Sequence, residues 1–64
     1  MNKEQQQRID SAISTLEVLG DREYTVVKTD KGTYVLESEQ RRVLITDNVQ
    51  WIINTLEELV SLVY

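Results

Sequence analysis

The residues that could do chemistry in this chain are carboxylates, hydroxyls and a few bases, because the sequence has neither cysteine nor histidine. Ser–His and Cys–His nucleophile pairs and thiolate or imidazole metal sites therefore cannot be built. Glu57 and Glu58 are adjacent in a predicted helix, so their side chains point about 100° apart and do not form a catalytic pair. Gly20 and Gly32 are isolated and build no phosphate-binding loop. We expect no catalytic residue, no cofactor and no metal site, and hence no enzyme.

The charged residues favour protein partners over nucleic acid. Eleven acids and seven bases give a net charge of −4. Nucleic-acid binding needs clustered bases that neutralise phosphates, whereas these bases are scattered. An acidic chain is better suited to a basic protein surface, although the same charge could simply keep a small protein soluble. Binding to anionic membranes is disfavoured because the bases are scattered and the net charge is negative.

The N-terminal residues and the apolar runs indicate a soluble cytoplasmic protein. Met1-Asn2-Lys3-Glu4-Gln5 has none of the apolar character of a signal peptide. The longest apolar runs are three residues, at 43–45 and 51–53, far shorter than a membrane span.

A chain of 64 residues is one domain, 1–64, and a small one. At this size folding buries only about 60% of the surface that the unfolded chain exposes, so a monomer is marginally stable. No disulfide or thiolate metal site can compensate. Self-association is the remaining common remedy.

The C-terminal stretch, residues 47–64, must position most of the large apolar side chains. The spacing of its aliphatic residues predicts an amphipathic helix that begins at Asp47 as N-cap, with Gln50 bonding back to it. The stripe that would face the core comprises Val49, Ile52, Ile53, Leu56, Leu59, Val60 and Val63.

Two apolar residues of this helix fall outside the stripe. Trp51 and Leu62 project about 150° from its centre, beside Thr55 and the Leu59 edge. They are either incidental exposed residues or a second contact face, and we favour the contact face because Trp is enriched at interface centres.

A second helix is predicted near residues 3–19, since Ile9, Ala12, Ile13, Leu16 and Leu19 repeat the same spacing. Val18 is the one apolar residue outside that pattern. Gly20 fits the left-handed position that ends a helix.

Residues 23–29 and 33–38 are rich in β-branched and aromatic residues and read as a hairpin around Asp30-Lys31-Gly32. A type I turn with Gly32 in the left-handed bulge position would set Thr29 opposite Thr33 and Val27 opposite Val35.

A third strand, residues 42–46, leads directly into the C-terminal helix. An even count in the preceding loop would place Val43 and Ile45 on the face of Tyr24 and Leu36. Leu44 would then join Val27 and Val35 on the other face. The expected core is Ile13, Leu16, Val26, Leu36, Ile45, Ile53 and Leu56.

The predicted fold is α+β, a two-layer α-β-β-β-α domain in which both helices cover one face of a three-stranded antiparallel meander. Val27, Val35 and Leu44 would form an apolar row on the uncovered face, and this row is either an ordinary half-exposed surface or an interface.

The order α-β-β-β-α resembles the double-stranded-RNA-binding domain, in which a Lys-rich start of the second helix contacts phosphates. Here that stretch is Thr46-Asp47-Asn48-Val49-Gln50, which is acidic and has no Lys. The resemblance therefore concerns topology and carries no function.

Size, acidity and element order, with Tyr24-Thr25-Val26 and Tyr34-Val35-Leu36, are also similar to some phage-encoded anti-CRISPR inhibitors. That resemblance implies a compact acidic protein that occupies a basic, nucleic-acid-binding surface of a host protein.

The leading hypothesis is a non-catalytic protein–protein interaction module that forms a homodimer and could act as a small acidic inhibitor or modulator, covering a basic surface of a target protein. One alternative is a nucleic-acid-binding domain; the other is a structural or assembly subunit whose only partner is itself. The candidate interface residues are Trp51, Thr55, Leu59, Leu62, Val27, Val35 and Leu44, and the bases available to nucleic acid are Lys28, Lys31, Arg41 and Arg42.

Overall fold

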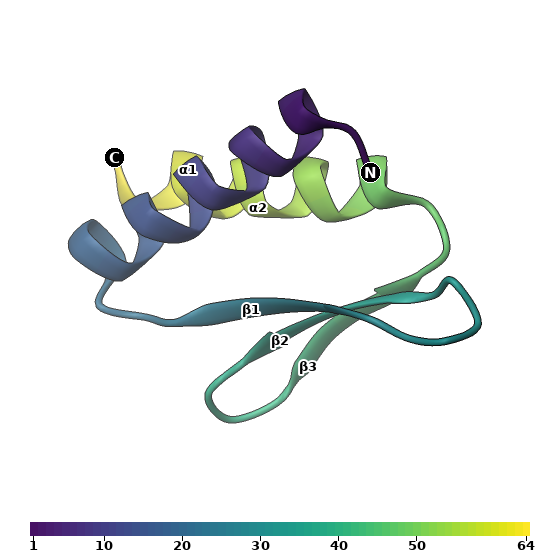
Figure 1. Cartoon of the computed structure of the whole chain (residues 1–64). Coiled ribbons are helices and arrows are strands. Elements are labelled where there is room, and N and C mark those ends of the chain that lie inside the picture. The colour runs from purple at the N-terminus through teal and green to yellow at the C-terminus, as the bar shows by residue number, and fades with distance from the viewer.

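The computed structural model describes residues 1–64 and confirms the order α-β-β-β-α. The elements are α1 (Lys3–Gly20), β1 (Tyr24–Lys28), β2 (Tyr34–Ser38), β3 (Arg42–Thr46) and α2 (Val49–Val63). The strands form one antiparallel sheet in the order β1-β2-β3, and both helices cover the same face of it (Figure 1). The α+β architecture expected from the sequence is thus the observed one.

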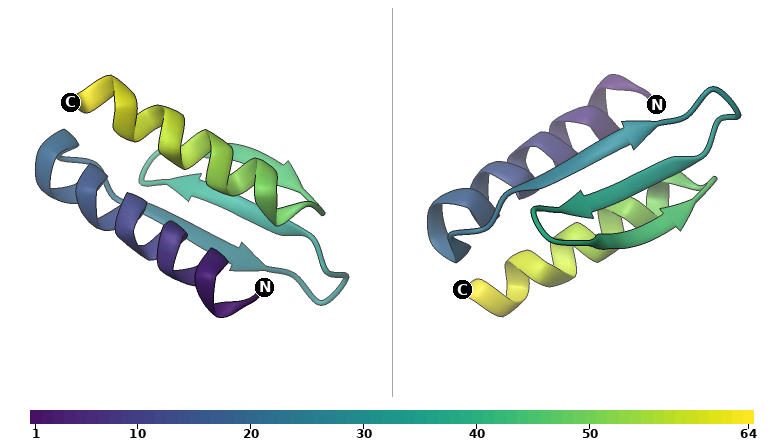
Figure 2. Two further views of the ribbon diagram at one scale, coloured as in Figure 1. Left: turned by 90° about the horizontal axis from the view of Figure 1, so that it is seen from above. Right: turned by 90° about the horizontal axis from the view of Figure 1, so that it is seen from below.

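The two helices lie side by side and run in the same direction, so both C-terminal ends are at one end of the molecule (Figure 2). α1 lies over β1, and α2 lies over β2 and β3. Gly20 makes the close approach between the helix ends possible, because a Cβ there would lie 3.2 Å from Cγ1 of Val63.

α1 begins at a capping box. The Asn2 side chain accepts a hydrogen bond from the Gln5 backbone N–H (2.8 Å), and the Gln5 side chain accepts one from the Asn2 N–H (3.1 Å). The expectation that Gly20 ends the helix in the left-handed region is wrong. Asp21 has that conformation, with φ of 52°, and its N–H donates to the Leu16 carbonyl.

The hairpin has the predicted turn and register. The Thr29 N–H donates to the Thr33 carbonyl (2.8 Å), and the Gly32 N–H donates to the Thr29 carbonyl (3.0 Å). Gly32 has φ of 82°. Val27 is opposite Val35, so the register of the first two strands is as the sequence predicted, and the strands lie within the predicted runs 23–29 and 33–38.

The predicted register of β3 is wrong. Leu44, not Val43 or Ile45, is the residue opposite Leu36, and Ile45 is opposite Val35 on the uncovered face. A β-bulge makes Val43 an extra residue in the pairing, and an extra residue reverses the alternation of side chains that follow it. Val43 and Leu44 both pack against the core, whereas Ile45 is 55% exposed.

α2 starts one residue later than predicted. Its N-cap is Asn48, whose side chain accepts from the Gln50 N–H (3.0 Å), while the Asn48 N–H donates to the Thr46 hydroxyl (3.1 Å). The bond to Thr46 positions Asn48, not Asp47, at the cap. The Gln50 side chain donates to Asn54 one turn along instead of bonding back to the cap.

The core is a single cluster between the helices and the sheet. Its buried members are Ile9, Ala12, Leu16, Tyr34, Leu36, Ile52, Ile53 and Leu56. Of the predicted core residues, Leu16, Leu36, Ile53 and Leu56 are buried, Ile13 and Val26 are partly buried, and Ile45 is not in the core.

Candidate protein–protein interaction surface

The α2 flank, formed by Trp51, Thr55, Leu59 and Leu62, is the side of α2 that faces away from α1. Trp51 is 60% exposed and Leu62 is 78% exposed. The opposite side of the helix is in contact with α1, where Glu57 pairs with Arg8. Trp51 and Leu62 therefore have no partner in the layer of helices, as the helical spacing indicated.

The remaining two residues of the α2 flank connect it to the core. Thr55 and Leu59 are half-buried, and Leu59 packs against the buried cluster. Apolar surface is thus continuous from the core through Leu59 to the exposed Leu62 in the next turn. Thr55, between Trp51 and Leu59, is a small residue that allows close approach of another chain.

The uncovered sheet face carries a shorter apolar row, Val27, Val35 and Ile45, one residue from each strand. Val35 lies in the central strand and is only 9% exposed, because its neighbours on either side cover it. Leu44, expected in this row, instead packs against the core on the helix side of the sheet. Only the two outer residues of the row, Val27 and Ile45, are exposed, at 43% and 55%.

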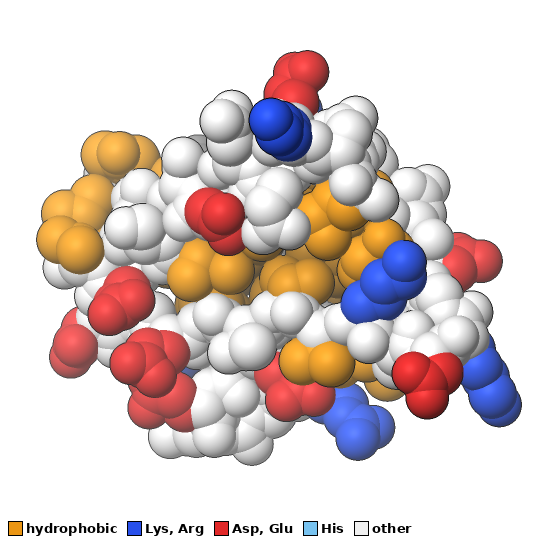
Figure 3. Space-filling model, in the orientation of Figure 1, with side chains coloured by type: hydrophobic (Ala, Val, Ile, Leu, Met, Phe, Trp, Pro, Cys, Tyr) orange, Lys and Arg blue, Asp and Glu red, His pale blue; other side chains and the backbone are white.

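The C-terminal ends of the helices form a third surface. Val18, Leu19 and Val63 are exposed there, and neither helix has a basic residue in its last turn. Acidic and apolar side chains predominate at this end of the molecule in Figure 3. Two parallel helices add their partial negative charges at the same end, so this surface attracts cationic groups. Val18 was the sequence signal for it, as the apolar residue outside the stripe.

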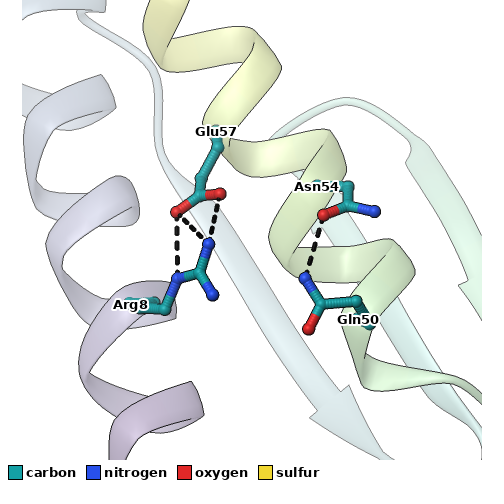
Figure 4. A network of polar contacts seen from close by, with 4 residues as sticks. All are labelled: Arg8, Gln50, Asn54 and Glu57. Atoms are coloured by element: carbon teal, nitrogen blue, oxygen red, sulfur yellow. Dashed lines mark hydrogen bonds and ion pairs between the residues drawn. The ribbon is translucent and has the colours of Figure 1, made fainter.

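A shallow groove of ≈ 540 Å³ separates the upper sides of α1 and α2. Six of its eight lining residues are polar or charged, and it is crossed by a bidentate ion pair between Arg8 and Glu57, with Nη2–Oε1 and Nε–Oε2 distances of 2.7 Å and 3.1 Å (Figure 4). The hydrogen bonds and charge of Glu57 raise the pKa of the Arg8 guanidinium. The pair ties the two helices together and occupies the groove, which is a structural role.

The four bases that nucleic acid could use are divided between two places. Lys28 and Lys31 are at the β1–β2 turn, and Arg41 and Arg42 are at the β2–β3 turn. These turns lie at opposite ends of the sheet (Figures 1 and 2). Lys28 also lies over the Tyr34 ring, with Nζ 5.9 Å from its centroid. The four bases therefore form no single patch.

Three further observations concern chemistry and comparison with known proteins. No group of three or more acidic side chains is close enough together to hold a metal ion. No helix combines the length and the apolar character needed to cross a membrane. Comparison with protein-family models, with curated proteins and with solved structures finds no match to this chain. Its function is therefore inferred from its own surface.

Proposed function

We propose that this chain is a non-catalytic protein–protein interaction module that assembles as a homodimer through the α2 flank. The observation that carries the proposal is the pair of exposed large side chains on that flank, Trp51 at 60% and Leu62 at 78%. Trp is among the residue types that are enriched near the centres of protein interfaces. If this surface is buried against a second copy across a two-fold axis, every contact between residues occurs twice.

The small size of the core supports association. Nine of 64 residues are buried, and the accessible surface is 4705 Å². A monomer of 7.5 kDa is expected to expose about 4250 Å² from the usual scaling with mass. The chain by itself thus leaves more surface in water than a protein of its mass normally does. Covering the α2 flank would remove part of that excess.

Two alternatives, self-association through the open sheet face and binding of nucleic acid, have less support than the α2 flank. The row on the open sheet face has its central residue, Val35, already covered by its own neighbours. The nucleic-acid hypothesis needs one basic patch, and its four bases lie at two ends of the sheet in a chain of net charge −4. Neither surface combines large exposed side chains with continuity to the core.

An inhibitor or modulator that covers a basic surface of a target would use a different part of the molecule. The acidic end at which both helices terminate suits such a target, because apolar contacts and cation attraction coincide there. This use is compatible with a dimer that buries the α2 flank, because Val18, Leu19 and Val63 are not part of that flank. A homodimer without any target would correspond to the purely structural subunit.

Sedimentation or light scattering at micromolar concentration tests the homodimer. The expected mass is twice 7.5 kDa for the natural chain, and close to 7.5 kDa for Trp51→Glu, since a charge at the centre of an apolar contact must be desolvated. Val27→Glu is the matched control, because Val27 is an exposed apolar residue on the open sheet face. It should leave the dimer intact.

The outcome that contradicts the proposal is a monomeric mass for the natural chain at these concentrations. If instead Val27→Glu dissociates the dimer and Trp51→Glu does not, the interface is the open sheet face. Far-UV circular dichroism of both variants distinguishes dissociation from unfolding.

A further inference from the structure

One side of the molecule carries both the α2 flank and the free edge of the sheet. β3 is an outer strand of the sheet, and α2 lies over the half formed by β2 and β3. The α2 flank faces away from α1, so it projects on the side of the β3 edge (Figure 2). A partner that covers the flank from this side also meets the edge strand.

The charges along this edge have an order that complements itself. Arg41 directly precedes β3, Arg42 is its first residue and Asp47 follows its end, with the apolar stretch 43–45 between them. All three charged residues are exposed, and none has an ion pair within the chain, whose one ion pair joins Arg8 and Glu57. An edge that is basic at one end and acidic at the other pairs favourably with its own copy when the two run antiparallel.

The same two-fold axis would suit the helix above the edge. In an antiparallel pair centred on Leu44, Arg41 of one copy is on the same side of the centre as Asp47 of the other. Asp47 is three residues, about 10 Å, from the centre at 3.3 Å per residue. In an antiparallel pair of α2 helices, Trp51 meets Leu62 of the second copy, and the centre lies between Leu56 and Glu57, about 11 Å along the axis from Val49.

These two centres lie at the same level along the molecule. β3 and α2 run in opposite directions and are joined by the two residues Asp47 and Asn48, so the end of the strand and the start of the helix are adjacent. Leu44 lies about 10 Å from this connection along β3, and the midpoint between Leu56 and Glu57 lies about 11 Å from it along α2. The two centres are therefore at similar distances from the same end of the molecule. One rotation therefore satisfies the charges of the edge and the apolar side chains of the flank together.

We propose that the second copy docks on this side across a two-fold axis, with Arg41 of each chain next to Asp47 of the other and Trp51 next to Leu62. The proposal rests on the homodimer inferred above and names its geometry. Side chains carry the contact, because the β-bulge at Val43 and the shortness of β3 limit regular pairing of backbone groups along this edge. The arrangement also gives Arg41 and Asp47, which have no ion pair within the chain, a partner of opposite charge.

A charge-swap experiment tests this geometry. Arg41→Glu places like charges at both ends of the interface, and so does Asp47→Arg, so each variant alone should dimerise at least tenfold more weakly than the natural chain. An equimolar mixture of the two variants should recover association as a heterodimer. In that heterodimer the two substituted side chains face each other with opposite charges, and the unchanged Arg41 of one chain faces the unchanged Asp47 of the other. Native mass spectrometry resolves the heterodimer from either homodimer.

Two control variants change the net charge equally at distant places. Lys3→Glu matches Arg41→Glu, and Asp10→Arg matches Asp47→Arg; both positions are exposed on α1. These controls should dimerise like the natural chain, which separates a local contact from general repulsion. Recovery in the mixture also shows that both charge-swap variants fold.

The proposed axis falls if either charge-swap variant dimerises as tightly as the natural chain, or if the mixture remains monomeric. If Trp51→Glu dissociates the dimer while the charge swaps have no effect, the homodimer stands and only this geometry is overturned. If the natural chain is monomeric, both proposals fail together.

Discussion

Gly20, Asp21 and Gly32 show how single residues take roles that their types only partly predict. Gly32 has the left-handed backbone that its turn requires. Gly20 does not; its missing side chain instead leaves room for Val63 of the other helix, and Asp21 takes the left-handed position. The turn could be predicted because its cause is local. The contact with Val63 joins two helices that are far apart in the sequence, which no local pattern reveals.

Gly32→Val should destabilise the domain through the backbone alone. No atom lies within 4 Å of a Cβ built at Gly32, whose φ is 82°, so the expected loss of about 1–3 kcal/mol comes from strain in a β-branched residue. Lys31→Val, in the same turn at negative φ, should change the unfolding free energy by less than about 0.5 kcal/mol. Urea unfolding of both variants measures the difference. Equal losses would show that strain at position 32 is not the cause.

At the scale of elements, the helices, the hairpin and the extent of the third strand could be predicted, and the register of the third strand could not. Helical spacing and the hairpin turn fix those elements through residues a few positions apart. The register of β3 depends on a bulge at Val43 opposite the Leu36–Glu37 step, and a single extra residue reverses which side chains face the core. Both Leu44 and Ile45 fit either face by type, so composition could not decide between them.

Truncations in β3 distinguish the observed register from the predicted one. Leu44→Ala should cost about 2 kcal/mol, at the low end of the range for large-to-small changes, because Leu44 is partly buried against the core. Ile45→Ala should cost less than about 1 kcal/mol, because that side chain is 55% exposed. Denaturant midpoints of the two variants provide the test. A larger loss at Ile45 would support the register without the bulge.

At the scale of the whole molecule, the candidate interface was predictable in part. Helical spacing predicted that Trp51 and Leu62 project away from the core, and both are exposed. The edge of β3 could not be associated with them, because the relation between Arg41, Asp47 and the α2 flank exists only once the helices are placed on the sheet. Because α2 lies over β2 and β3, Trp51 and the charged residues at the ends of β3 are on the same side of the molecule.

Folding and association of this chain should therefore be coupled. For a folded dimer that unfolds to two separate chains, a tenfold rise in concentration adds about 1.4 kcal/mol per dimer, or about 0.7 kcal/mol per chain. For a domain of this size that raises the Tm by roughly 3–6 °C. The natural chain should show this dependence in thermal unfolding at several concentrations, and Trp51→Glu should unfold at a lower Tm that does not change with concentration. A Tm of the natural chain that stays constant across a hundredfold range would mean that its small core suffices alone, and that the exposed Trp51 does not stabilise the fold through a second copy.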